Sequence, residues 1–110
     1  MQRFLFLFVG LASPPEDDSV QTRDYRQSWV AWMAELASKG ILESGLPLAG
    51  SGKVVKKDAV ADLSLQREDI GGYLLIRANS LDEAVEIAQQ APHMALGGTT
   101  FVRPCLEVNR

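Results

Sequence analysis

The 110-residue chain contains one imidazole, His93, and one thiol, Cys105. Histidine titrates near neutral pH, so His93 is a candidate general acid or base if a carboxylate lies close to it. The alternative is a polar residue at a helix end, because His93 follows Pro92 directly. Cys105 is more typical of a packing residue than of a nucleophile, since His93 is its sole potential imidazole partner.

The same counts exclude several classes of protein. One cysteine forms no internal disulfide, and one histidine with one cysteine cannot supply the four ligands of a structural zinc site. We therefore expect no metal and no cofactor. The formal charge of −3 gives no attraction to nucleic acid or to an anionic membrane, so neither is an expected partner.

The segment Gly50-Ser-Gly-Lys53 is reminiscent of a phosphate-binding loop but fails its pattern. Position 47 is proline where the pattern needs glycine, and position 54 is valine where it needs serine or threonine. We interpret Gly50–Lys53 as a hairpin turn.

Aromatic residues offer a second kind of site. Trp29 and Trp32 lie at core spacing on a predicted helix, and Tyr73 lies on a predicted strand. They either pack in the core or form the wall of a pocket for a flat, partly apolar ligand. Arg103 has apolar neighbours in the last predicted strand and needs a carboxylate, from the protein or from a bound acid. The run containing Glu68 supplies candidates, although a solvated charge cluster is the ordinary interpretation.

The first residues admit two interpretations. Arg3, the apolar run 4–9 and the small residues 10–12 resemble a short secretory leader. The run also fits a strand that is apolar on both faces, with its three phenylalanines on one side. We favour the strand.

Further elements follow from periodicity and capping signals. A first helix should begin at Ser13, Asp18 or Ser19 and end at Gly40. A second helix should begin with a capping box at Ser80 and end before Pro92. Its apolar side is expected to bury Leu81, Ala84, Val85 and Ala88. Strands are expected at 54–55, 70–76 and 99–108, with an irregular or edge strand at 41–48 and a loop with some strand character at 56–69. This order predicts one α+β domain spanning 1–110, with both helices on one face of its sheet. The other face is also apolar, so we expect a second copy to cover it in a face-to-face dimer.

An ordered set of short motifs resembles the YCII-related family, in particular its Asp-Gly-Pro-Phe (DGPF) branch. The motifs are Trp29-Val-Ala-Trp32-Met33, Gly40, Gly45-Leu-Pro-Leu48, Glu68-Asp-Ile-Gly-Gly-Tyr73, Ser80-Leu-Asp-Glu-Ala84, Pro92-His93, Gly97-Gly98 and Val102-Arg-Pro104. The resemblance implies a ferredoxin-like antiparallel sheet that dimerises sheet-to-sheet into an α/β barrel. It also favours the strand interpretation of the first residues, and with it a cytoplasmic protein.

The resemblance also implies an acid/base pair that this chain lacks. The family's histidine falls on Trp29 and its aspartate on Ala91. Asp62 is a candidate substitute for the missing acid, and Glu68 matches the acidic residue before the Gly-Gly-aromatic strand.

Two functions remain open. The chain is either a small-molecule-binding module with an accessory or regulatory role, which the association of the family with sigma factors suggests, or a cofactor-free enzyme. The enzyme would act as a lyase or isomerase on an aromatic, quinone-like or lactone-like substrate, with His93 or Asp62 transferring the proton. In both cases Trp29, Trp32 and Tyr73 would form the walls of the site, with Glu68 beside it and Arg103 as the anion contact.

Overall fold

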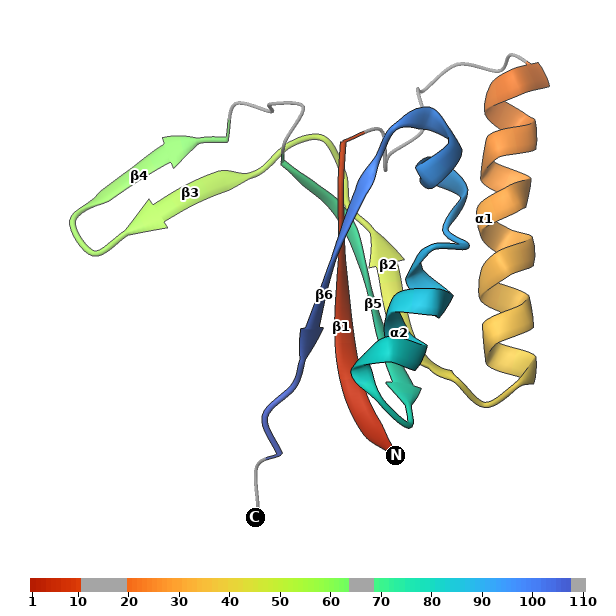
Figure 1. The fold of residues 1–110 in the computed structure, drawn as a ribbon. Helices are drawn as coiled ribbons and strands as arrows, with labels where there is room; N and C mark the ends of the chain where they lie inside the picture. The colour runs from red at the N-terminus through yellow and green to blue at the C-terminus, as the bar shows by residue number, and fades with distance from the viewer. Residues whose placement is uncertain (11–19, 64–68, 108–110) are drawn as a thin grey trace.

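The structure, a computed structural model, describes residues 1–10, 20–63 and 69–107. Its elements, in chain order, are β1 (Gln2–Val9), α1 (Val20–Ser38), β2 (Leu42–Pro47), β3 (Lys53–Lys56), β4 (Ala59–Asp62), β5 (Ile70–Ala78), α2 (Leu81–Ala88), the short 3-10 helix η1 (Pro92–Leu96) and β6 (Thr99–Pro104) (Figure 1). No helix in these ranges is long and apolar enough to cross a membrane.

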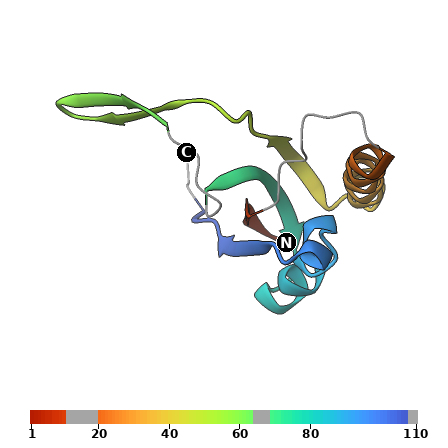
Figure 2. The ribbon, with the colours of Figure 1, turned by 90° about the horizontal axis from the view of Figure 1, so that it is seen from above.

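Four strands form one antiparallel sheet in the order β2-β5-β1-β6. The two strongly apolar strands, β1 and β5, occupy its centre, which explains why they have few polar positions. Both helices lie on one side of this sheet (Figure 2). The fold is thus the predicted α+β, ferredoxin-like antiparallel sheet with its helices on one face.

The two faces of the sheet differ in what covers them. Phe4, Phe6 and Phe8 point to the helices and are buried there, together with Leu74 and Ile76 of β5. The opposite side, which we call the open face, is partly exposed because no described helix covers it. Its apolar residues, assigned by strand register, are Leu5, Leu7, Leu46, Tyr73, Leu75 and Phe101.

Helix α1 ends as the sequence predicts. Gly40 has φ +73°, a conformation that favours glycine, and the Ile41 amide donates to the Leu36 carbonyl at 2.9 Å. Trp32 and Leu36 are buried, and Trp29 packs against the core. The predicted start at Ser13, Asp18 or Ser19 lies outside the described residues.

Helix α2 has the predicted capping box but a different buried face. Ser80 Oγ accepts from the Glu83 amide at 3.1 Å. The buried side chains are Ala84, Ile87 and Ala88, whereas the predicted Leu81 and Val85 are exposed. The chain then turns at residues 89–91, and helix η1 begins at Pro92, because proline is well suited to the first position of a helix.

The hairpin turn predicted at Gly50–Lys53 was wrong. The turn of the hairpin lies at Lys57–Asp58, between β3 and β4. Strand β3 contains the predicted short strand 54–55, and β4 lies in the segment predicted as a loop with some strand character. This two-stranded ribbon projects from the main sheet (Figure 1). The projection agrees with the Cα radius of gyration of 15.2 Å, which exceeds the value of about 13 Å for a compact chain of this length. The last strand, β6, ends at Pro104 and not at Val108.

Candidate ligand-binding cleft

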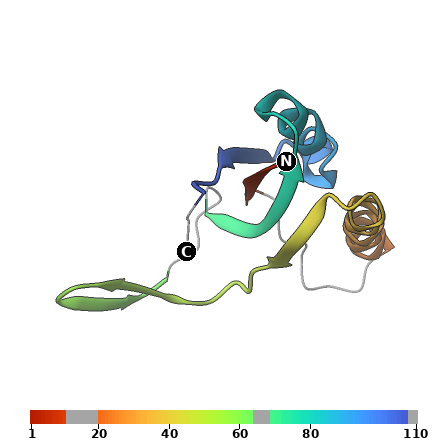
Figure 3. The ribbon, with the colours of Figure 1, turned by 90° about the horizontal axis from the view of Figure 1, so that it is seen from below.

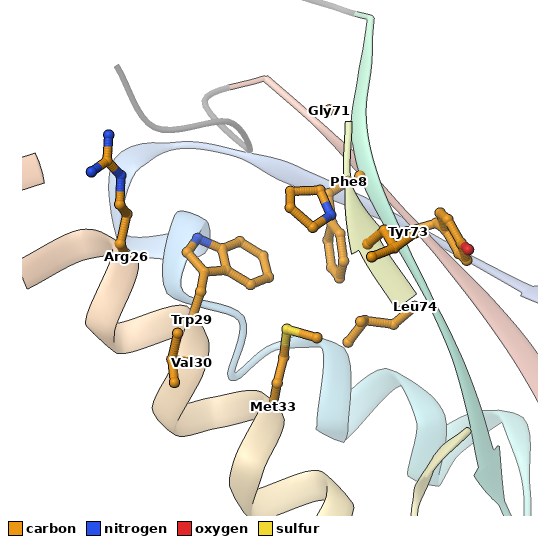
Figure 4. Close-up of a pocket in the computed structure, with 11 residues that line it drawn as sticks. Phe8, Arg26, Trp29, Val30, Met33, Gly71, Tyr73 and Leu74 are labelled. Carbon is orange, nitrogen blue, oxygen red and sulfur yellow. The ribbon is translucent and has the colours of Figure 1, made fainter. Parts of the chain in front are cut away.

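A cleft of about 310 Å³ lies between α1 and the strands β2 and β5. Figure 4 shows Trp29 and Met33 of the helix facing Phe8 and Leu74 of the sheet across it, while the Tyr73 ring points away. Its lining is almost entirely apolar and consists of Phe8, Arg26, Trp29, Val30, Met33, Leu46, Pro47, Gly71, Gly72, Tyr73 and Leu74. A concave, largely apolar lining with a single charged group is typical of sites for small organic ligands.

Close approach of β2 to β5 shapes one side of the cleft. A β-carbon on Gly45 would lie 2.2 Å from Leu74 Cδ2 and 2.6 Å from the Tyr73 carbonyl oxygen. No real β-carbon fits at such distances, so the strand spacing requires glycine at this position. Because Leu74 and Tyr73 line the cleft, Gly45 controls its width without lining it.

The inner wall of the cleft is a cluster of aromatic rings. The Phe8 and Trp29 centroids lie 4.9 Å apart with their planes at 71°, and those of Trp29 and Trp32 lie 5.6 Å apart. His93 joins the cluster from behind, 5.2 Å from Phe8 and 5.5 Å from Trp29. These ring contacts, edge-to-face except for the tilted Trp29–His93 pair, hold in place the Trp29 ring that a flat ligand would meet.

The His93 side chain is fully buried and has a defined tautomer. Its Nε2 lies 3.0 Å from the Thr99 carbonyl oxygen. A carbonyl only accepts, so Nε2 carries the proton and Nδ1 carries a lone pair. Nδ1 has no hydrogen-bond partner within the described residues. Burial lowers the pKa of His93 below its ordinary 6.5, and the bond to Thr99 opposes this only in part.

The polar groups at the outer end of the cleft come from α1. Arg26, one turn before Trp29, is the charged side chain that lines it (Figure 4). Burial raises the pKa of the neighbouring Tyr25, and the Trp29 indole N–H opposes this by stabilising the phenolate. That N–H lies near the Tyr25 hydroxyl without reaching hydrogen-bond geometry.

The model of the YCII-related domain matches residues 6–109. The chain belongs to the YCII-related family. It is also similar in structure to 5-chloro-2-hydroxyhydroquinone dehydrochlorinase from Burkholderia phenoliruptrix AC1100, solved in complex with 2,5-dihydroxybenzoquinone. The two share 21% identity over 96% of this chain and 95% of the other, with a TM-score of 0.59, which shows a common fold. A comparison with curated protein sequences gives no match.

Only part of the site predicted for this YCII-related chain comes together around the cleft. Trp29 lines it, and Trp32 and His93 lie directly behind the lining rings. Tyr73 borders the cleft, but its ring points to the open face and does not form the predicted wall (Figure 4). Ala91, at the position of the family's aspartate, is buried at the start of η1.

Two other predicted residues, Asp62 and Arg103, do not line the cleft within this chain. Asp62 is exposed in β4 and forms an ion pair with Lys53. Arg103 lies opposite Leu5, on the open face of the sheet. Glu68 lies outside the described residues. The predicted partnership of Asp62 with His93 is therefore not formed within one copy.

The sequence prediction missed Arg26, Met33 and Phe8 as cleft residues. One signal was present, since Arg26, Trp29 and Met33 recur at three- and four-residue spacing and so lie on one helix face. In the described ranges, no group of three His, Cys, Asp or Glu residues is placed to hold a metal ion.

Proposed function

We propose that this YCII-related protein binds a flat, largely apolar small molecule in the cleft beneath α1. The observation that carries the proposal is the lining itself, with Trp29, Phe8 and Met33 around about 310 Å³ of space and one charged group at the edge. This volume is near the lower end for ligand sites, which fits a ligand of one or two rings.

The chemistry of the lining favours a ring with an acidic oxygen. The apolar walls favour a ring over a sugar or a peptide, whose hydroxyl or amide groups would lose their hydration without gaining partners. The Arg26 guanidinium suits a carboxylate or an acidic hydroxyl near the opening. The fold shared with a protein solved with 2,5-dihydroxybenzoquinone supports a quinone-like compound as the first probe.

The proposal includes a homodimer in the cytoplasm with an accessory or regulatory role. The apolar open face has no described element over it, and a second copy would bury Leu5, Leu7 and Leu75 of each chain. Two sheets joined in this way would form the α/β barrel that the family resemblance implies. A protein of this kind would act by reporting the presence of its ligand to a partner.

A second candidate function, cofactor-free acid/base catalysis, is favoured by the state of His93. Neutral His93 has an unpartnered Nδ1 lone pair and contacts the Trp29 and Phe8 rings. In this role Nδ1 would accept a proton from a hydroxyl of the substrate and later return it. The His93 ring does not line the cleft, so this chemistry requires the Trp29 or Phe8 ring to move aside.

Binding is tested by titrating the protein with 2,5-dihydroxybenzoquinone and following tryptophan fluorescence. We expect saturable quenching, weakened at least tenfold in Trp29→Ala and severalfold in Arg26→Gln. Arg23→Gln is the matched control, because Arg23 is exposed on the same helix and does not line the cleft. No saturation with the probe, or equal losses in the two arginine variants, would contradict the proposed site.

Turnover separates the two functions. Catalysis predicts a time-dependent change in the absorbance of a hydroxyquinol or quinone substrate, lost in His93→Ala and retained in Asp62→Asn, because Asp62 does not line the cleft. A binding module predicts a higher melting temperature with the probe and no change in its absorbance.

A further inference from the structure

The ribbon formed by residues 53–62, which we call the arm, makes few contacts with its own chain. Its two strands pair with each other, with Val55 opposite Val60 and Val54 opposite Ala61. At its base the Leu63 amide donates to the Gly52 carbonyl at 2.9 Å. Every residue of the arm is exposed.

The arm is apolar on both of its sides. Val55 and Val60 lie on one side with 72% and 65% of their surface exposed, and Val54 lies on the other with 41% exposed. A two-stranded ribbon is only marginally stable alone in water, and exposed apolar strands promote association. The composition of the arm therefore suits a surface that becomes covered.

The position of the arm indicates what covers it. In Figures 2 and 3 the arm extends from the sheet on the side away from α1 and α2, which is the side of the open face. Any molecule that docks on the open face lies next to the arm. A molecule on the open face could therefore contact both the flat sheet and the projecting arm.

Charge also favours a second copy as the occupant. The arm carries three lysines against two aspartates, whereas the whole chain has a formal charge of −3. A positive arm and a negative body attract each other across a two-fold axis, where each copy supplies both parts.

We propose that the arm clamps a second copy of this chain seated on the open face, so that each copy holds the other. The clamp rests on the homodimer of the proposed function. The clamped copy also borders the strand pair that forms one side of the cleft, because Leu46 and Tyr73 are paired on the open face while Leu74 of the same strand pair faces the cleft. The arm follows Pro47 in sequence, so it extends directly from that strand pair.

Sedimentation equilibrium of the double variant Val55→Lys/Val60→Glu tests the clamp. The two positions face each other, so the introduced charges preserve the ribbon by pairing while removing its apolar surface. We expect the dimer dissociation constant to rise at least tenfold. The control Val85→Lys removes an exposed valine from α2, on the helix side, and should leave the constant unchanged.

The outcomes separate the clamp from the dimer. A wild-type monomer at all concentrations would reject both the dimer and the clamp, whereas an unchanged dissociation constant in the double variant would reject the clamp alone. Trypsin gives a second test on the wild type, because Lys56 and Lys57 lie at the tip of the arm. Cleavage there should slow above the dissociation constant, and concentration-independent cleavage would overturn the clamp.

Discussion

Gly98 lies against the ring of His93 so closely that a β-carbon at position 98 would be 2.1 Å from Cδ2 and 2.7 Å from Cγ. The glycine thus occupies the side of the imidazole next to the carbon Cδ2, while Nε2 donates to Thr99. His93 in turn supports the Phe8 and Trp29 rings. Gly98, which has no side chain, therefore determines the position of His93 and, through it, of the Phe8 and Trp29 rings that form the inner wall of the cleft.

Gly98→Ala should move His93 and destabilise the fold by about 1–3 kcal/mol, as overpacking of a close-packed core does. The Trp29 ring should respond with it, so we expect a shift in tryptophan emission. Urea denaturation and fluorescence measure the two effects. Gly52→Ala is the matched control, because its β-carbon would meet only the Leu63 side chain, at 3.4 Å. Equal stability of the two variants would contradict this view of Gly98.

Stability should fall as the pH drops below about 6.5. Burial lowers the pKa of His93 in the folded protein, so the unfolded chain binds the proton more readily. The stabilisation by neutral His93 is complete above pH 6.5 and is lost as the pH falls towards the folded-state pKa. His93 is the chain's single histidine, so His93→Asn should flatten the curve of unfolding free energy between pH 6.5 and about 5, above the ordinary carboxylate range. NMR titration of the imidazole in the wild type checks the cause directly, and a pKa at or above 6.5 would disprove it.

Gly45→Ala should widen the cleft and weaken binding of the quinone probe. The new methyl group would push β2 away from the Leu74 side chain and the Tyr73 backbone, which are too close to accept it. We expect a loss of about 1–3 kcal/mol in stability and a severalfold lower affinity for 2,5-dihydroxybenzoquinone. The exposed neighbour Ser44→Ala serves as the control. Unchanged affinity in Gly45→Ala would show that the strand spacing does not shape the site.

Periodicity predicted the sheet well because its central strands are apolar on both faces. Alternating burial in β1 and β5 follows directly from the phenylalanines of one and the leucine and isoleucine of the other. The turn of the arm was misplaced because Lys57–Asp58 lacks glycine, while Gly50 and Gly52 carry a stronger turn signal. Local propensity placed the turn where the glycines are.

The aromatic part of the cleft was predictable, and its polar part was not. Trp29 and Tyr73 stand out because large rings need a partner surface. Arg26 looks like any solvated residue on a helix until Trp29 and the strands β2 and β5 enclose the space beside it. Burial of His93 depends on Gly98, which sequence reasoning interpreted only as part of a turn.

Glu43 links three strands on the open-face side of the sheet. Its Oε1 accepts from Arg3 Nε at 2.9 Å and also from Arg77 Nε, and 16% of its side chain is exposed. The hydrogen bonds from Arg3 and Arg77 hold the pKa of Glu43 below its ordinary 4.5. The stabilisation by ionised Glu43 is therefore present above pH 4.5 and is lost as the pH falls through the folded-state pKa.

Glu43→Gln should lower the urea midpoint at pH 7 and reduce the further loss of stability below pH 4.5. The matched control is Glu35→Gln, whose partner Lys39 lies at 2.8 Å but with both side chains about half exposed. Exposed pairs of this kind contribute little, because water and salt screen them. Glu43→Gln should also weaken the proposed dimer, since it removes the carboxylate that Arg3 and Arg77 share on the open face. If the two glutamine variants unfold at the same urea concentration at pH 7, the Glu43 pair is as dispensable as an ordinary surface ion pair.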